Sequence, residues 1–480
     1  MILERFYDEK LAQASWLVGC ATTGEALIVD ANRDVAQYLA SAQAEGLRIT
    51  HVAETHIHAD FVSGSRELVA ATGARLLLSG EGDADWHYGF LGSDGATALN
   101  DGDRFHVGNI EVEVVHTPGH TPEHLSFLIT DRAGANRPMG IFTGDFVFVG
   151  DVGRPDLLEK AAGHAGTAAT AARALFRSLD WFRALPDYVQ VWPGHGAGSA
   201  CGKALGAVPQ STVGYEKLFN PALAISDEAR FIDWVLEDQP EPPKYFAEMK
   251  RINREGPRVL NGFATPPRRD LAALERALGA GGLVVDTRSA SAFRQAHIPG
   301  TINIPLNRAF TTWAGWLLPY DAEVYLVVDE REHAGALSEV VRDLAMIGLD
   351  RVAGWVSASV LQEWAARHGA LESAAEVDTG RLARAVAGDA VIIDVRDRSE
   401  WAAGHIPGVL HIPLGELPDR ADEIPRDRPI AVHCQSGSRA AIAQSLLLAR
   451  RFEDVRNVRG GFSAWQGEGR PVERGEPQRA

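Results

Sequence analysis

The seven residues Thr55-His-Ile-His-Ala-Asp-Phe61 decide how the N-terminal part of this 480-residue chain folds. They follow residues 48–53, an apolar and β-branched run that is typical of a strand. Side chains alternate between the two faces of an extended segment, so His56, His58 and Asp60 point the same way. Imidazole and carboxylate groups together suit zinc, iron or manganese. The stretch therefore predicts a metal site directly after a buried strand.

Three later fragments supply further ligand types in the same setting. They are His116-Thr-Pro-Gly-His120, Thr143-Gly-Asp145 and Trp192-Pro-Gly-His195. Each comes at the end of an apolar, strand-like run, and helical stretches lie between these runs. Loops at the carboxyl ends of strands are where α/β folds build their sites. We therefore expect these histidines and this carboxylate to converge with the first motif.

The C-terminal half contains a duplication. Val284-Val-Asp-Thr-Arg288 and His297-Ile-Pro-Gly300 are echoed, at one constant offset, by Ile392-Ile-Asp-Val-Arg396 and His405-Ile-Pro-Gly408. A repeating unit of about 100 residues is a small domain and not a solenoid repeat. Short apolar runs alternate with helical stretches in each copy, which is typical of an α/β domain with a parallel sheet.

The second copy holds a candidate nucleophile. A strand-like run, 429–433, leads into Cys434-Gln-Ser-Gly-Ser-Arg439 and then into a helical stretch. Backbone N–H groups at a helix N-terminus, with Arg439 beside them, stabilise a thiolate. In the first copy Asp329 stands at the position of Cys434, and the residues after it lack both the glycine and the arginine. We expect that copy to be catalytically silent.

The composition excludes several classes of protein. An apolar fraction of 45% and a charged fraction of 23% are those of a folded globular chain. The net charge of −17 disfavours partners such as nucleic acids and anionic membrane surfaces. Three cysteines are too few for a disulfide framework. The sequence shows neither a secretory leader nor an apolar run long enough to span a membrane, so we expect a cytoplasmic protein. We also expect a homo-oligomer.

The ordered set of histidine and aspartate motifs resembles that of the metallo-β-lactamase superfamily, whose fold is an αββα sandwich. The first motif of that superfamily usually reads His-x-His-x-Asp-His, and Phe61 replaces the last histidine here. The resemblance implies that a second metal ion would lose a ligand, which disfavours a two-zinc hydrolase. It leaves His56, His120 and Asp145 to hold Fe(II), with open positions for substrate and O2.

The same resemblance implies supporting roles for residues around this set. Asp60 and His195 are expected to orient ligands, water or substrate. His58 is either a metal ligand or a member of this supporting group. Arg154 binds a substrate carboxylate or forms a structural salt bridge. Cys201, on a glycine-rich loop, contacts the substrate or is a buried core cysteine.

The Cys434 loop resembles the active loop of rhodaneses, which carry sulfur as a cysteine persulfide. The resemblance implies that Cys434 is the nucleophile and that Arg439 is its cationic catalytic partner. The terminal sulfur of the persulfide would be cradled by the residues between them: Gln435, Ser436, Gly437 and Ser438.

The chain as a whole resembles persulfide dioxygenase–sulfurtransferase fusions. The resemblance implies a metallo-β-lactamase-like domain at 1–245, a silent rhodanese-like domain at 265–370 and an active rhodanese domain at 378–480. It also implies one Fe(II) per chain, O2-dependent oxidation of a low-molecular-weight thiol persulfide to sulfite, and transfer of sulfur through Cys434 to give thiosulfate. The alternatives are a metal-dependent thioester hydrolase of the glyoxalase II kind that carries a rhodanese domain, and a non-catalytic sulfur carrier.

Overall fold

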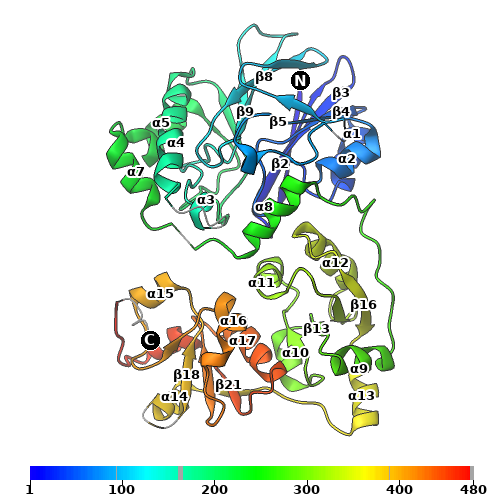
Figure 1. The fold of residues 1–480 in the computed structure, drawn as a ribbon, viewed down its shortest axis with the longest axis vertical. Coiled ribbons are helices and arrows are strands. Elements are labelled where there is room, and N and C mark those ends of the chain that lie inside the picture. The colour runs from blue at the N-terminus through cyan, green and yellow to red at the C-terminus, as the bar shows by residue number, and fades with distance from the viewer. Residues whose placement is uncertain (93–94, 161–165, 240, 387, 389, 476–480) are drawn as a thin grey trace. The chain divides into compact units, whose positions relative to one another are not determined.

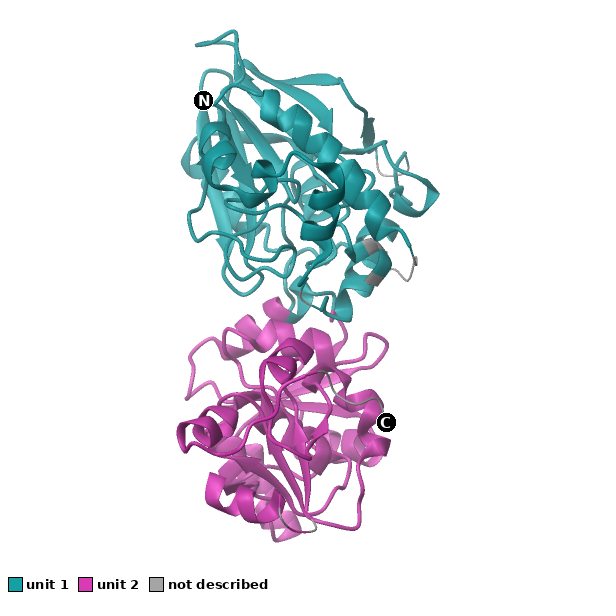
Figure 2. Cartoon of the chain, turned by 90° about the vertical axis from the view of Figure 1, so that its left-hand side faces the viewer, with its two compact units in different colours: residues 1–264, 344–348 teal, residues 265–343, 349–480 magenta. Residues whose placement is uncertain are grey.

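The computed structural model describes residues 1–480 apart from 93–94, 161–165, 240, 387, 389 and 476–480 (Figure 1). The chain forms two compact units, drawn in different colours in Figure 2. Unit 1 comprises residues 1–264 with 344–348, and unit 2 comprises residues 265–343 with 349–480. The boundary between them falls at Thr265-Pro-Pro267, a proline-rich stretch of the kind that separates domains.

Unit 1 contains two six-stranded mixed sheets, with the strand orders β1-β2-β3-β4-β5-β6 and β12-β11-β10-β9-β8-β7. Their bounds are β1 Ile2–Asp8, β2 Gln13–Cys20, β3 Glu25–Val29, β4 Arg48–Ala53, β5 Arg75–Ser79, β6 Thr97–Leu99, β7 Arg104–Val107, β8 Ile110–His116, β9 Leu125–Asp131, β10 Gly140–Gly144, β11 Gln190–Pro193 and β12 Ser211–Thr212. The helices of the unit are α1 Ala36–Ala44, α2 Ser65–Thr72, α3 Leu157–Lys160, α4 Ala168–Ala184, α5 Val213–Phe219, α6 Pro221–Ala224, α7 Glu228–Leu236 and α8 Tyr245–Glu255, with a 3-10 turn at Ala84–Trp86.

Three apolar clusters hold these layers together. Trp16 of β2, Phe127 of β9 and Trp192 of β11 belong to a central cluster between the two sheets. A second cluster packs α1 and α2 against the first sheet, and a third packs α4 and α7 against the second sheet. The layers therefore run helix, sheet, sheet, helix, which confirms the predicted αββα sandwich.

Unit 2 contains two parallel sheets with matching topology, β14-β13-β15-β16 and β19-β18-β20-β21-β17. The first copy comprises α9 Leu271–Gly279, β13 Leu283–Asp286, α10 Ala290–Gln295, β14 Ile302–Asn303, α11 Phe310–Leu317, β15 Val324–Val328, α12 Ala336–Met346, β16 Val352–Ser357 and α13 Val360–His368. The second comprises β17 Ala375–Val377, α14 Thr379–Val386, β18 Val391–Asp394, α15 Arg398–Ala403, β19 Leu410–His411, α16 Leu417–Arg420, β20 Ile430–His433, α17 Ser438–Ala449, β21 Val455–Val458 and α18 Gly461–Gly467, with 3-10 turns at Leu414–Glu416 and Ala421–Glu423.

The two copies of unit 2 share a buried polar contact. The backbone N of Asn303, at the end of β14, donates to Ser445 Oγ of α17 over 2.9 Å. Both residues are buried, so the edge strand of the first copy supports the helix that follows Cys434. The duplication predicted from the sequence is thus present as two joined α/β folds. Within the described residues, no helix has the length and apolar character needed to cross a membrane.

Candidate functional site

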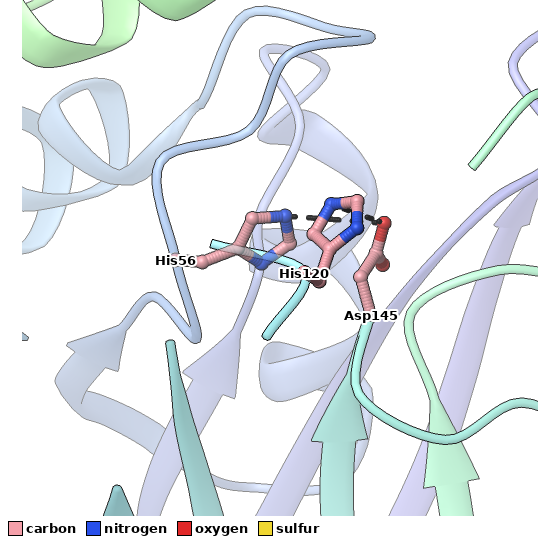
Figure 3. A group of neighbouring side chains, drawn as sticks. All are labelled: His56, His120 and Asp145. Carbon is pink, nitrogen blue, oxygen red and sulfur yellow. Dashed lines mark ion pairs between the residues drawn. The ribbon is translucent and has the colours of Figure 1, made fainter. Parts of the chain in front are cut away.

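His56, His120 and Asp145 form the first candidate metal group (Figure 3). They follow β4, β8 and β10, because loops at the carboxyl ends of these strands meet at one edge of the sandwich. One ligand atom from each side chain lies within 4.8 Å of the other two. Nε2 of His120 is 3.4 Å from Oδ2 of Asp145, and Nε2 of His56 is 3.9 Å from it. The structure thus brings together the three residues predicted to bind the metal.

The two imidazoles of this group are oriented by their other ring nitrogens. Nδ1 of His56 is hydrogen-bonded to Thr55 Oγ1 at 2.9 Å, and Nδ1 of His120 to the carbonyl of Arg154 at 3.1 Å. Each Nε2 is therefore left to face Asp145. Burial lowers the pKa of both histidines, which favours the neutral imidazole that binds metals.

The donor atoms at this position fit a cation. Both carboxylate oxygens of Asp145 are buried and accept no hydrogen bond from any described residue. An isolated ionised carboxylate is costly in a protein interior, and a metal ion removes that cost. Two neutral imidazoles with one carboxylate match the requirements of zinc, iron or manganese. The residues present therefore fit a divalent metal ion.

Asp60, His195 and Cys201 form a second buried group beside the first. One ligand atom from each lies within 4.8 Å of the others. Nε2 of His195 is 3.2 Å from Asp60 Oδ2 and 3.5 Å from Asp145 Oδ2, while its Nδ1 bonds to the carbonyl of Ala12 at 2.9 Å. Burial and the nearby carboxylates raise the pKa of the Cys201 thiol well above its ordinary value. The sequence predicted that His195 converges with the motif that contains Asp60, but it left open whether Cys201 reaches the site or is a buried core cysteine.

His58 lies outside both metal groups and instead bonds to Asp30. Its Nε2 is 3.2 Å from Asp30 Oδ1. Burial alone would lower the pKa of His58, but the charge and hydrogen bond of Asp30 raise it to about 9. The ring of Phe61 packs on His58, with 4.4 Å between the ring centroids. An apolar ring thus occupies the last position of the first motif.

Arg154 forms a buried salt bridge. Its Nε and Nη2 each lie 2.7 Å from a carboxylate oxygen of Asp156, and Nη1 donates to the carbonyl of Ala200 over 3.1 Å. Its backbone N also donates to the carbonyl of Cys201. The side chain is fully buried, which favours the structural alternative: Arg154 anchors the loop that carries Cys201.

Two residues that position the metal group were not predicted. His124 Nε2 accepts from the backbone N of Asp145 over 3.1 Å, and the ring stacks on that of His56. Asp30 accepts from both the backbone N and Oγ1 of Thr55, the residue that orients His56. The sequence signals for these roles are weak: His124 lies close to His120 in the chain, and Asp30 directly follows a strand-like run. Neither signal shows which other segment of the chain the side chain contacts.

The Cys434 loop surrounds a buried thiol with backbone amides. The backbone N of Gly437 lies 3.1 Å from Sγ of Cys434. Gln435 is held on two sides, by Ser463 Oγ at 2.9 Å and by Arg396 Nη1 at 3.3 Å. Arg396 is in turn paired with Asp394 at the end of β18. The Asp-x-Arg motif of the second copy therefore holds the Cys434 loop through the bond from Arg396 to Gln435.

Arg439, at the start of α17, is held in place by two carboxylates. Its Nη1 and Nη2 bond to Glu400 at 2.6 and 2.8 Å, and Nη1 is 3.2 Å from Asp397. Burial alone would raise the pKa of Glu400, but the hydrogen bonds from Arg439 outweigh it and lower that pKa. Ser436 and Ser438, the remaining residues of the loop, are exposed.

The corresponding loop of the first copy is filled by its own carboxylates. Glu330 accepts from the backbone N of Gly335 at 3.1 Å and of Leu337 at 2.9 Å. Asp329 accepts from the backbone N of Arg331 at 3.0 Å. The amides that would stabilise an anionic sulfur are thus occupied, in agreement with the loss of the cysteine.

Comparisons with known proteins agree with this division. The profile of the metallo-beta-lactamase superfamily matches residues 9–195, and that of the rhodanese-like domain matches residues 270–362 and 378–468. The chain belongs to the metallo-β-lactamase superfamily and carries two rhodanese-like domains. A crystal structure of a metallo-beta-lactamase from Staphylococcus aureus subsp. aureus COL is 44% identical, with a TM-score of 0.66, and covers 74% of this chain and 99% of that one.

Each curated relative matches only part of the chain. The hydroxyacylglutathione hydrolase of Rhodospirillum rubrum is 33% identical over 38% of this chain, which spans 60% of that protein's length. The mitochondrial persulfide dioxygenase ETHE1 of Bos taurus is 27% identical over 48% of this chain and 78% of its own length. A sulfurtransferase of Allochromatium vinosum is 36% identical over 20% of this chain and 92% of its own length. The lactamase domain thus resembles both a thioester hydrolase and a persulfide dioxygenase.

Gly461→Ala should disable the rhodanese loop. Gly461 has φ of +53°, and a Cβ there would collide with the carbonyl of Cys434 and lie 2.9 Å from that of Gln435. We expect the free energy of unfolding to fall by about 2 kcal/mol and sulfur transfer to fall at least about tenfold. Thermal unfolding and a thiosulfate:cyanide sulfurtransferase assay measure these effects.

Gly467→Ala is the matched control, because a Cβ at Gly467 meets nothing within 4 Å. Equal losses in the two variants would show that the collision at Cys434 is unimportant.

Proposed function

We propose that the lactamase domain oxidises a low-molecular-weight thiol persulfide to sulfite with O2 and Fe(II), and that the second rhodanese copy transfers sulfur through Cys434 to give thiosulfate. The observation that most supports this proposal is the group of two histidines and one carboxylate formed by His56, His120 and Asp145. The phenyl ring of Phe61 stands where the first motif would otherwise supply a further ligand. The likeness to a persulfide dioxygenase supports this proposal.

His56, His120 and Asp145 would hold the single iron, which supplies open positions for O2 and for the persulfide sulfur. Thr55 and the carbonyl of Arg154 keep the two imidazoles in the orientation described above. His124 fixes the backbone of Asp145. These contacts hold the ligand set in place before any substrate arrives.

The second buried group would face the substrate. We assign Asp60 and His195 to orienting substrate or water, because the two side chains contact each other and His195 Nε2 lies 3.5 Å from Asp145 Oδ2. Cys201 would contact the persulfide as a neutral thiol, in keeping with its raised pKa. Arg154 holds the Cys201 loop, and each of its guanidinium nitrogens already donates to Asp156 or to the carbonyl of Ala200, which favours the structural role over contact with a substrate carboxylate.

Sulfur transfer would pass through a covalent persulfide on Cys434. The Cys434 thiolate attacks the outer sulfur of a second thiol persulfide, a new S–S bond forms, and the carrier leaves as a thiolate. Sulfite then attacks the outer sulfur, thiosulfate forms, and the Cys434 thiolate returns. The amide of Gly437 stabilises the negative sulfur, while Arg439 adds positive charge. Fusion in one chain raises the effective concentration of sulfite at Cys434.

The alternative is a thioester hydrolase with a rhodanese domain. The likeness to a hydroxyacylglutathione hydrolase and the second buried group of possible ligands both favour it. Phe61 opposes it, because a phenyl ring cannot bind a second ion. A non-catalytic sulfur carrier is disfavoured by the complete ligand set.

The remaining proposals concern the organisation of the protein. We propose a lactamase domain at 1–245, a silent copy at 265–370 and an active copy at 378–480. We also propose that the protein is a cytoplasmic homo-oligomer whose partners are thiol persulfide, O2 and sulfite.

Metal content distinguishes the proposed persulfide dioxygenase from the alternative thioester hydrolase. Protein purified without oxygen should contain about one iron per chain, and a chelator that removes it should abolish O2 uptake with glutathione persulfide. Elemental analysis and an oxygen electrode measure both quantities. Two tightly bound zinc ions per chain, with hydrolysis of a glutathione thioester, would favour the alternative.

His120→Ala should abolish O2 uptake and leave sulfur transfer at wild-type level, because the two sites belong to different domains. The expected loss of O2 uptake is at least about a hundredfold. His106→Ala is the control, since the side chain of His106 is 58% exposed and belongs to neither metal group. Loss of both activities in a folded variant would contradict the separation.

Cys434→Ser should change the product and not the rate of O2 uptake. Its hydroxyl is too weak an acid to accept sulfur, so sulfite should accumulate where the wild type gives thiosulfate. Chromatography of both anions after complete O2 consumption tests this. If thiosulfate remained the main product, the transfer step would belong to another group, with Cys201 the next candidate.

A further inference from the structure

A cavity of about 500 Å³ lies in unit 2 at the position where the first rhodanese-like copy would hold its nucleophile. It is lined on one side by Asp329, Arg288 and Trp313 of the first copy. Ser438 and Arg439, from the Cys434 loop of the second copy, line its other side. This volume lies in the range of sites that bind small molecules.

The first copy has lost the nucleophile but has kept the space in front of it. Its loop amides are bound by Glu330 and Asp329, as described above, so a persulfide cannot be stabilised there. Nothing in this arrangement closes the cavity itself. The geometry therefore favours a first copy that binds a small molecule in this cavity but carries no sulfur itself.

Arg288 offers this cavity a hydrogen-bond donor. Its Nε and Nη2 are bound by Asp286 and by the carbonyl of Ala296, but no described residue accepts from Nη1. In the second copy the equivalent Nη1, that of Arg396, donates to Gln435 at 3.3 Å. A free guanidinium N–H beside a cavity is suited to a ligand carboxylate.

Acidic and aromatic groups complete the lining. Glu332 is exposed, and among the described residues it accepts a single long hydrogen bond, 3.5 Å from the backbone N of Ser289. The side chain of Asp329 is 21% exposed, and its Oδ1 lies 3.4 Å from Nε of the exposed Arg331. These carboxylates would attract an ammonium group, and the half-buried ring of Trp313 offers an apolar face. The lining thus suits a molecule with a carboxylate, an ammonium group and an apolar part.

We propose that this cavity binds the carrier part of an amphoteric thiol persulfide, one with both a carboxylate and an ammonium group, and directs its sulfur to Cys434. The inference rests on the proposed transfer through Cys434 and names its sulfur donor. Ser438 lines the cavity and is the next residue after Gly437, whose amide lies 3.1 Å from Sγ of Cys434. The Cys434 thiolate takes the outer sulfur, the carrier's S–S bond breaks, and the carrier leaves as a thiolate.

Trp313→Ala tests the shape of the site in the full-length protein. Glutathione persulfide and thiosulfate serve as sulfur donors, and sulfurtransferase rates give KM and kcat for each. We expect KM for glutathione persulfide to rise about tenfold, with kcat and the KM for thiosulfate unchanged. Trp364→Ala is the matched control, because Trp364 is also half-buried in the first copy but lies on α13 and does not line the cavity. No rise, or an equal rise for both donors, would overturn the proposal.

Glu332→Gln tests the charge of the site, with Glu363→Gln as the exposed control on α13. KM for glutathione persulfide should rise by about threefold or more, while that for 3-mercaptopropionate persulfide, which lacks an ammonium group, should not change. Mass spectrometry of the wild-type protein, which measures the sulfur added to Cys434 by glutathione persulfide, distinguishes failure of the proposed transfer from failure of carrier binding in this cavity. Absence of the added sulfur would contradict the proposed function and this inference together, whereas normal loading with unchanged KM in both variants would contradict this inference alone.

Discussion

The buried carboxylate of Asp145 is the constraint on which the lactamase domain depends. It lies 3.4 to 3.9 Å from the Nε2 atoms of His56, His120 and His195, and no described residue donates a hydrogen bond to it. Uncompensated, such a charge would cost several kcal/mol. The surrounding loops hold the imidazoles of His56 and His120, whose pKa values burial lowers, toward this carboxylate, where a bound cation would balance its charge.

The rhodanese copies balance their buried carboxylates internally. Asp394 pairs with Arg396, and Asp286 pairs with Arg288, in the same geometry at the same strand end. The pair is present in both copies and Cys434 in only one, so the pair by itself does not distinguish the copy that carries the cysteine. In the second copy the charge of Asp394 is balanced by Arg396, so the amide beside Cys434 is left to stabilise an anion. In the metal site the charge of Asp145 has no such partner among the described residues and is left to bind a cation.

Much of this organisation could be predicted because it depends on local patterns. The runs that predict β4, β8 and β10 lead into the residues that form the site, and the constant offset of the Asp-x-Arg motif reveals the duplication. The roles of Asp30 and His124 could not be predicted, since they act on ligands of other segments. The same holds for the grouping of Cys201 with Asp60: Cys201 lies in an irregular loop, where no periodicity fixes its direction.

The silent copy can therefore be explained without a nucleophile. Its edge strand supports α17 through the bond between Asn303 and Ser445, so its removal would disturb the helix that begins beside Cys434. Its loop has exchanged a sulfur-binding cradle for the carboxylate of Glu330, and this exchange leaves the cavity open. Under the proposed roles, one duplicated fold divides two tasks that a single rhodanese loop would have to combine, because the copy that stabilises the persulfide need not also recognise its carrier.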